Sequence, residues 1–137
     1  MNYFKFPEKA VHHIASIPFV YLMVFPIVIL DIFLEIYHQI CFRLYDLPLV
    51  PRGAYIKIDR HRLEYLDNVQ KINCVYCGYS NGLIKYAMVI FAETEAYWCG
   101  IQHKEDDIFK APDHHKSFLP HGDRDYFEEK IIKKLKD

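Results

Sequence analysis

Residues 14–30 read Ile-Ala-Ser-Ile-Pro-Phe-Val-Tyr-Leu-Met-Val-Phe-Pro-Ile-Val-Ile-Leu, and this apolar stretch decides the fold class. It belongs to a run of 21 residues between Lys9 and Asp31 that contains no Asp, Glu, Lys or Arg. At about 1.5 Å per residue, a helix of this length covers roughly 31 Å, the thickness of the hydrocarbon core of a bilayer. The stretch also lacks the polar face of an amphipathic helix on a soluble core. The sequence therefore predicts a single transmembrane helix near the N-terminus.

Two other interpretations of this stretch stay open. A cleaved signal peptide has about 7–15 apolar residues and a small-residue cleavage site, whereas here the run is longer and Asp31-Ile-Phe-Leu-Glu-Ile-Tyr37 follows it. A buried helix of a soluble core is the second alternative. Pro18 and Pro26 would break a short soluble helix, but transmembrane helices tolerate proline when the freed carbonyls find local partners.

The charges around the stretch predict its orientation and its partners. Lys5 and Lys9 precede it, and a larger group of cations follows it, namely Arg43, Arg52, Lys57, Arg60 and Arg62. Because positive residues tend to stay inside, we expect a single-pass membrane protein whose C-terminal part is cytoplasmic. The formal net charge of −1 favours no nucleic-acid partner. The expected partners are the lipid bilayer and subunits of a membrane protein complex.

The pattern divides the chain into three segments and predicts a mainly α fold. Residues 1–42 would form the transmembrane anchor with an interfacial extension, and residues 43–58 a linker with a short extended segment at Ala54–Asp59. Residues 59–137 would form a small Cys/His metal-binding domain pinned by its ion. Within this domain we expect helices over residues 63–72, 80–98 and 123–136, with a polar loop over residues 104–122.

Four residues carry the predicted chemistry: Cys74, Cys77, Cys99 and His103, in a C-x2-C and C-x3-H arrangement. A tight turn after Cys74 would let two thiolates reach one ion, and the glycine after Cys77 would let backbone N–H groups point at sulfur. A C-x3-H pair spans about one helical turn, so both side chains can face the same ion. Three thiolates and one imidazole complete a closed tetrahedral zinc site.

One objection leaves the number of sites open. A straight helix from residue 80 to residue 98 would separate Cys77 from Cys99, unless it is shorter or breaks near Glu93. Otherwise Cys74 and Cys77 would recruit an additional histidine, for which the candidates are His61, His114 and His115. A Cys74–Cys77 disulfide is the further alternative in an oxidising compartment.

Three resemblances bear on this set. The stretch Cys74-Val-Tyr-Cys-Gly-Tyr79 resembles the first knuckle of rubredoxins and zinc ribbons, which implies metal binding by the two cysteines; Cys99-Gly-Ile-Gln-His103 replaces the second knuckle. The Cys99-x3-His103 pair is similar to one end of the NEET-type two-iron, two-sulfur (2Fe-2S) proteins, which implies an iron–sulfur alternative. Residues 55–103 resemble a family of uncharacterised bacterial membrane-anchored proteins, which implies no activity but suggests that these segments form one site.

A second constellation, Glu35-x2-His38, His61-x2-Glu64 and Glu93/Glu95, partly matches a di-iron carboxylate pattern. Only one Glu-x-x-His, Glu35-x2-His38, has the required direction. We therefore expect these residues to be polar residues at the membrane interface and on solvated helix faces rather than ligands of iron. No catalytic motif is present, and no catalytic residue is predicted. The expected function is a membrane-anchored accessory or structural subunit with zinc (Zn). The alternatives are an electron-transfer protein with iron (Fe) or a 2Fe-2S cluster, and a thiol oxidoreductase that uses Cys74 and Cys77.

Overall fold

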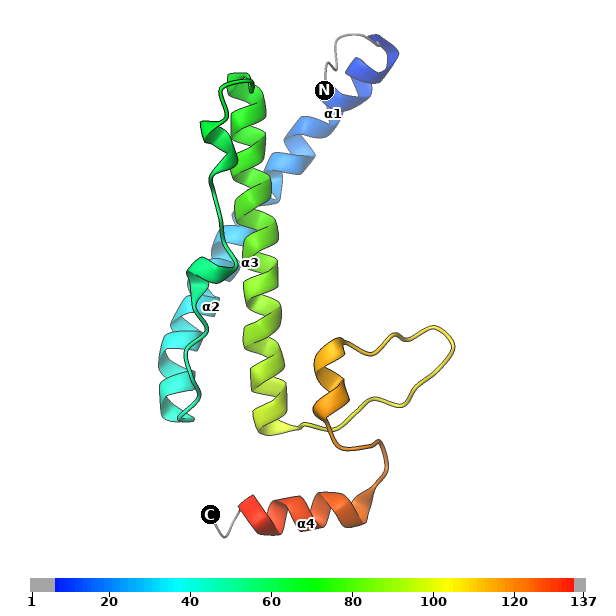
Figure 1. The fold of residues 1–137 in the computed structure, drawn as a ribbon. Helices are drawn as coiled ribbons and strands as arrows, with labels where there is room; N and C mark the ends of the chain where they lie inside the picture. Colours follow the sequence, from blue (N-terminus) through cyan, green and yellow to red (C-terminus); the bar gives the residue numbers. More distant parts are fainter. Residues whose placement is uncertain (1–6, 135–137) are drawn as a thin grey trace. The chain divides into compact units, whose positions relative to one another are not determined.

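A computed structural model describes residues 7–134 as mainly helical, with no β-strand among them (Figure 1). The helices are α1 (Pro7–Leu22), α2 (Val24–Leu44), α3 (Asn68–Trp98) and α4 (Arg124–Lys134), with short 3-10 helices η2 (Arg52–Ala54), η3 (Arg60–Arg62) and η4 (Asp113–Ser117). The mainly α prediction is confirmed. The chain forms two compact units, Met1–Ala87 and Met88–Asp137, so the boundary lies inside α3 and not in the predicted linker.

The predicted apolar helix is present, with one break at Met23 between α1 and α2. Pro26 explains the break, because its ring collides with the carbonyl four residues earlier, at Leu22, where α1 ends. The amide of Ile27 bonds to the carbonyl of Met23 at 3.2 Å, so the helix resumes at once. Residues 11–44 together are long and apolar enough to cross a membrane. The prediction of one such segment near the N-terminus is confirmed in its length and apolar composition.

Residues 45–67, which we call the connector, lead from the end of α2 back to the start of α3. Arg52 of the connector binds Asp31 near the middle of α2, and its later residues lie against Gly78 and Gly82 of α3. Consequently α2 and α3 run in the same direction, with the connector running the opposite way (Figure 1). The linker is non-helical from residue 47 to residue 51, as predicted, but the predicted strand at residues 54–59 pairs with no neighbouring strand.

The region of the predicted knuckle is helical, so that prediction is wrong. Residues 68–98 form one continuous helix, with neither a turn after Cys74 nor a helix start at Ser80. The start lies at Asp67, whose carboxylate accepts the amide N–H of Gln70 at 2.8 Å while the Gln70 side chain accepts the Asp67 amide at 3.1 Å. This reciprocal pair is a capping box, and it fixes the first turn of α3.

The two glycines that suggested a turn serve close packing instead. A Cβ atom at Gly82 would lie 2.7 Å from the carbonyl oxygen of Tyr55, and one at Gly78 would lie 3.0 Å from that of Lys57. Real Cβ atoms almost never show the first distance, and the second is tighter than most Cβ contacts. The glycines therefore allow the connector backbone to lie directly on α3.

The first unit has an apolar core that surrounds a polar network. Leu34 and Phe42 of α2 pack in the interior of this unit, as do Leu83 and Tyr86 of α3. The network comprises Asp31, Glu35, His38, Arg52, Tyr79 and Tyr86. Arg52 binds Asp31 through both nitrogens, at 2.7 Å for Nη2, and Tyr79 donates to the same carboxylate at 2.6 Å.

His38 occupies the centre of this network and is 1% exposed. The backbone N–H of Val50 donates to His38 Nε2 at 3.0 Å, so the ring proton must sit on Nδ1. Nδ1 can then donate to the Tyr86 hydroxyl at 2.9 Å, and Tyr86 in turn donates to Glu35 at 3.2 Å. Every polar atom of His38 and Tyr86 therefore has a partner, and burial raises the pKa of Tyr86 to about 12.

The second unit contains the end of α3, a long loop, η4 and α4. The loop was predicted as polar and irregular over residues 104–122, which agrees with the structure except for the turn of η4. The predicted C-terminal helix is confirmed as α4, and Asp123 caps it by accepting the amide of Tyr126 at 3.1 Å. Residues 135–137 lie outside the described residues.

Candidate metal site

Glu95 lies in the last turn of α3, where the helix stops abruptly. The amides of Cys99 and Gly100 both bond to the carbonyl of Glu95 at 2.8 Å. Gly100 has a φ of 59°, a left-handed conformation that glycine adopts without steric cost and that commonly ends helices. The turn allows His103, three residues after Gly100, to lie near Glu95 at the end of α3.

Hydrogen bonds tie the segment after α3 to the segment that carries η4. Gln102 donates its side-chain nitrogen to the carbonyls of His115 and Phe118, at 3.0 and 3.2 Å. The backbone adds bonds from Leu119 to Gly100 and from Gln102 to Leu119, both at 2.8 Å. These bonds connect residues that are distant in sequence, and they place η4 beside the end of α3 within this unit.

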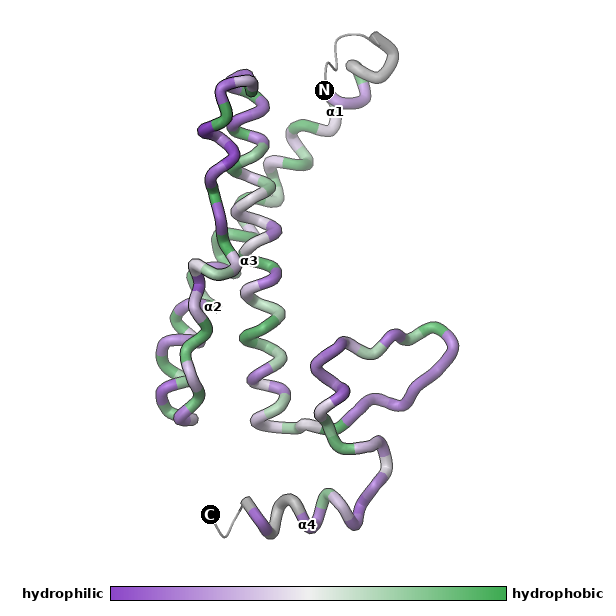
Figure 2. The backbone as a smooth tube through the Cα atoms, viewed as in Figure 1, coloured by the Kyte–Doolittle hydropathy of each residue, from purple (hydrophilic) through white to green (hydrophobic). Residues whose placement is uncertain are grey.

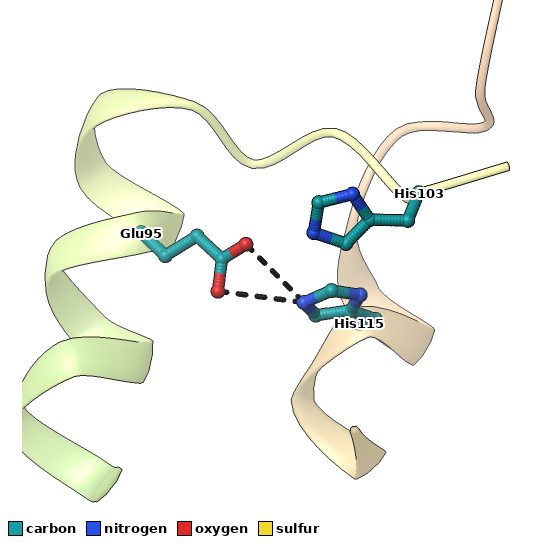
Figure 3. Close-up of side chains that lie close together, drawn as sticks. All are labelled: Glu95, His103 and His115. Carbon is teal, nitrogen blue, oxygen red and sulfur yellow. Dashed lines mark hydrogen bonds and ion pairs between the residues drawn. The ribbon is translucent and has the colours of Figure 1, made fainter. Parts of the chain in front are cut away.

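The carboxylate of Glu95 accepts hydrogen bonds from two imidazoles of η4, those of His114 and His115. Figure 3 shows the contact with His115. His114 Nε2 lies 3.0 Å from Oε2, and His115 Nε2 lies 3.2 Å from Oε1. The bond from His114, and to a lesser degree that from His115, holds the pKa of Glu95 below its usual value. Glu95 is therefore ionised at neutral pH, which is the form that binds a cation.

His103 completes a group of three with Glu95 and His115, and each residue offers one ligand atom within 4.8 Å of the others. The His103 ring lies 5.3 Å from the His115 ring, centroid to centroid (Figure 3). Ligands of one tetrahedral zinc ion lie about 3–3.5 Å apart, since each bond is about 2.0–2.2 Å long. The Glu95–His115 separation already fits this range, and the most distant pair must close by about 1 Å to bind one ion.

His115 is the buried member of the group. The residue is 3% exposed, and its ring stacks on Phe118 at 4.9 Å. Its Nε2 atom faces Glu95, whereas Nδ1 points to the other side of the ring and makes no hydrogen bond. Packing against Phe118 therefore holds Nε2 towards the carboxylate, and Nε2 is the atom that would bind an ion in the group of three.

A pocket of about 410 Å³ opens beside the histidines. His103 and His115 line one part of it, and the loop residues Asp106, Phe109 and Lys110 line another. Two imidazoles and one carboxylate occupy three positions of a metal ion and leave at least one free. The pocket gives an ion in this position access to water or to a small ligand.

The structure brings together only part of the predicted set. Of the four predicted ligands, only His103 belongs to the group of three, while His115 was predicted as an additional ligand. Cys74 and Cys77 lie within α3, and Cys99 is exposed just beyond its end. The predicted set of three cysteines and one histidine needed a break in the helix before Cys99, and α3 is continuous there.

The remaining candidates lie elsewhere. His61 belongs to η3 in the first unit, and His114 contacts Glu95 without being one of the three. All four cysteines are free, so the Cys74–Cys77 disulfide is absent. Glu35 and His38, which suggested a di-iron pattern, belong to the polar network of the first unit.

Sequence reasoning missed Glu95 as a partner of the loop histidines. Glu95 had been grouped with Glu93 in the di-iron pattern, although the histidine pair at 114–115 was available as a signal. The hydrogen bonds of Gln102 decide which carboxylate this pair meets, and no local pattern encodes them. Comparison with protein families, with characterised proteins and with solved structures finds no match to this chain.

Proposed function

We propose that this chain is a membrane-associated protein that binds one divalent metal ion, zinc, through Glu95, His103 and His115. The observation that carries the proposal is the convergence of an ionised carboxylate and two imidazoles. Both imidazoles line a pocket, and one of them is buried. A His2Glu set suits zinc, and it also suits Fe(II) in non-haem sites. A 2Fe-2S cluster does not fit this group, because it contains no thiolate.

Membrane association rests on the surface of α2. Its exposed large side chains are apolar along most of the helix, whereas Asp31 and His38 are turned inward. Glu35 is partly exposed, and the exposed Arg43 lies in the last turn. Membrane proteins show this arrangement, with apolar residues outside and ionisable residues facing the interior. An accessory role beside other membrane subunits, with the metal site on the cytoplasmic side, stays a prediction from the sequence.

Calorimetric titration of chelator-treated protein with zinc tests the metal site. We expect one zinc ion per chain, and we expect Glu95→Gln, His103→Ala and His115→Ala each to weaken binding about 100-fold or more, because each removes a ligand. Titration with Fe(II) without oxygen ranks the two metals in the same experiment.

His121→Ala is the matched control, since His121 is an exposed histidine of the same unit that lies outside the group of three. It should bind zinc like the unmodified chain. Unchanged zinc affinity in all three ligand variants would contradict the proposed site.

A further inference from the structure

α2 has two faces of opposite character. One face is buried in the first unit and carries Leu34, His38 and Phe42 together with the Asp31 carboxylate. The opposite face is at least half exposed at six large apolar residues: Phe25, Ile29, Ile32, Phe33, Ile36 and Ile40. Apart from the adjacent Ile32 and Phe33, they follow one another at three or four residues, which aligns them in one stripe along the helix. We call this set the outer stripe.

Charged residues gather on the connector, which contacts both α2 and α3. The Lys57 side chain is 82% exposed and that of Asp59 is 50% exposed, and Arg60 and Arg62 are exposed as well. The same segment is strongly hydrophilic in Figure 2. The first unit is therefore apolar along the outer stripe of α2 and charged along the connector.

The contacts of α3 fix the level of these charges along α2. Gly78 lies against the backbone of Lys57 and near the side chain of Arg60, and its neighbour Tyr79 bonds to Asp31. Tyr21 bonds to Asn73 and Val20 to Tyr76, so residues 20–31 of the apolar segment lie beside residues 73–79 of α3. From Lys57 the connector continues towards the start of α3 (Figure 1). If the apolar segment crossed a bilayer upright, the exposed charges from Lys57 to Arg62 would lie beside residues 20–31, within the membrane, where charged side chains are costly and rare.

The length of helix that is exposed on all sides also argues against an upright crossing. Residues 11–20 are exposed at every position, but contact with α3 begins at their end. The Tyr76 hydroxyl donates to the carbonyl of Val20, and the Tyr21 hydroxyl donates to Asn73. Ten residues of helix cover about 15 Å, which is half of the hydrocarbon core. The described part of the first unit therefore contains no helical stretch of about 20 residues that is exposed on every side, the length that a crossing surrounded by lipid alone requires.

We infer that the first unit lies flat on a membrane, with α2 parallel to its plane and the outer stripe in the boundary between headgroups and acyl chains. The inference rests on the proposed membrane association and replaces a crossing with an in-plane helix. An in-plane helix needs an apolar face along its whole length and a polar opposite side. The outer stripe supplies the first. The exposed charges of the connector, which bonds to the inner face of α2 through Arg52, supply the second.

Nitroxide depth profiles test the orientation. Single cysteines at Phe25, Ile29, Phe33, Ile36 and Ile40 are spin-labelled in a chain whose four native cysteines are alanine and whose helical circular dichroism is unchanged. The labelled chains are bound to vesicles of phosphatidylcholine with a minority of phosphatidylglycerol. Accessibility to oxygen relative to a nickel chelate then reports the depth of each label.

An in-plane helix predicts similar, shallow depths at all five positions and a water-exposed label at Lys57. Depths that peak near Ile29 and Phe33 and fall towards Ile40 would overturn the inference while leaving membrane association intact. Labels shielded from both oxygen and the chelate would also overturn it, since a protein would then cover the stripe. Failure of the unlabelled chain to bind the vesicles would instead refute the proposed membrane association.

A charge placed in the stripe gives a second, independent measurement. Ile36→Glu should weaken vesicle binding about tenfold or more without loss of helicity, because the charge must stay out of the acyl boundary. Ile58→Glu is the matched control, since Ile58 is an exposed isoleucine of the connector. Equal vesicle binding by the two variants would overturn the in-plane arrangement.

Discussion

The two units each contain a cluster of ionisable side chains, and the clusters differ in how their atoms are satisfied. In the first unit, both nitrogens of His38 have partners and Asp31 receives Arg52 and Tyr79. In the second unit, two imidazoles share one carboxylate, His115 keeps a buried nitrogen without a partner, and a pocket adjoins them. A saturated network stabilises a fold, whereas an unsaturated cluster at a pocket is prepared for a ligand.

The largest effect on stability is expected from the saturated network. His38→Ala leaves the Val50 amide and the Tyr86 hydroxyl unpaired and opens a cavity, which should lower the free energy of unfolding by about 3 kcal/mol. Chemical unfolding in detergent, followed by circular dichroism, measures this loss.

His114→Ala is the matched histidine variant from the unsaturated cluster. The His114 side chain is 34% exposed, and its removal should cost under about 1 kcal/mol because the site can rehydrate. Equal losses in the two variants would remove the distinction between the clusters.

A smaller effect is expected where the connector closes over the network. Gly82→Ala places a methyl group against the backbone of Tyr55 and Ile56, which should cost about 2 kcal/mol and loosen the connector that carries Arg52. Gly53→Ala is the control, because its Cβ would meet nothing within 4 Å, and it should change stability by less than about 0.5 kcal/mol. Thermal unfolding of both variants decides whether the glycine serves packing; a neutral Gly82→Ala would show that it does not.

The apolar segment and α4 could be predicted from the sequence because their signals are local. Hydropathy over residues 14–30 and the acid-to-base gradient of the last helix need no distant partner. The capping box of Asp67 and Gln70 was also readable and would have placed the start of α3 correctly.

The Cys74–Tyr79 stretch misled because a glycine after a cysteine looks the same in a metal knuckle and at a helix contact. The backbone of Lys57, which lies against Gly78, decides between them, and it arrives from a distant part of the chain. The grouping of Glu95 with His103 and His115 depends in the same way on the long-range bonds of Gln102. Local patterns could therefore supply individual ligands but not the set.

No effect on metal binding is expected from the cysteines. Replacing Cys74 and Cys77 together with serine should leave zinc stoichiometry and affinity unchanged, because neither thiol belongs to the group of three. Replacing Cys99 with serine should do the same. Loss of zinc from either variant, measured by elemental analysis after gel filtration, would restore the thiolate site that the sequence predicted.

X-ray absorption at the zinc edge tests the central claim most directly, because it reports the atoms bound to the ion. The account predicts a first shell of nitrogen and oxygen alone at about 2.0–2.1 Å, with the outer-shell scattering of two imidazole rings. A shell of sulfur at about 2.3 Å would show that cysteines hold the ion and would contradict the site formed by Glu95, His103 and His115.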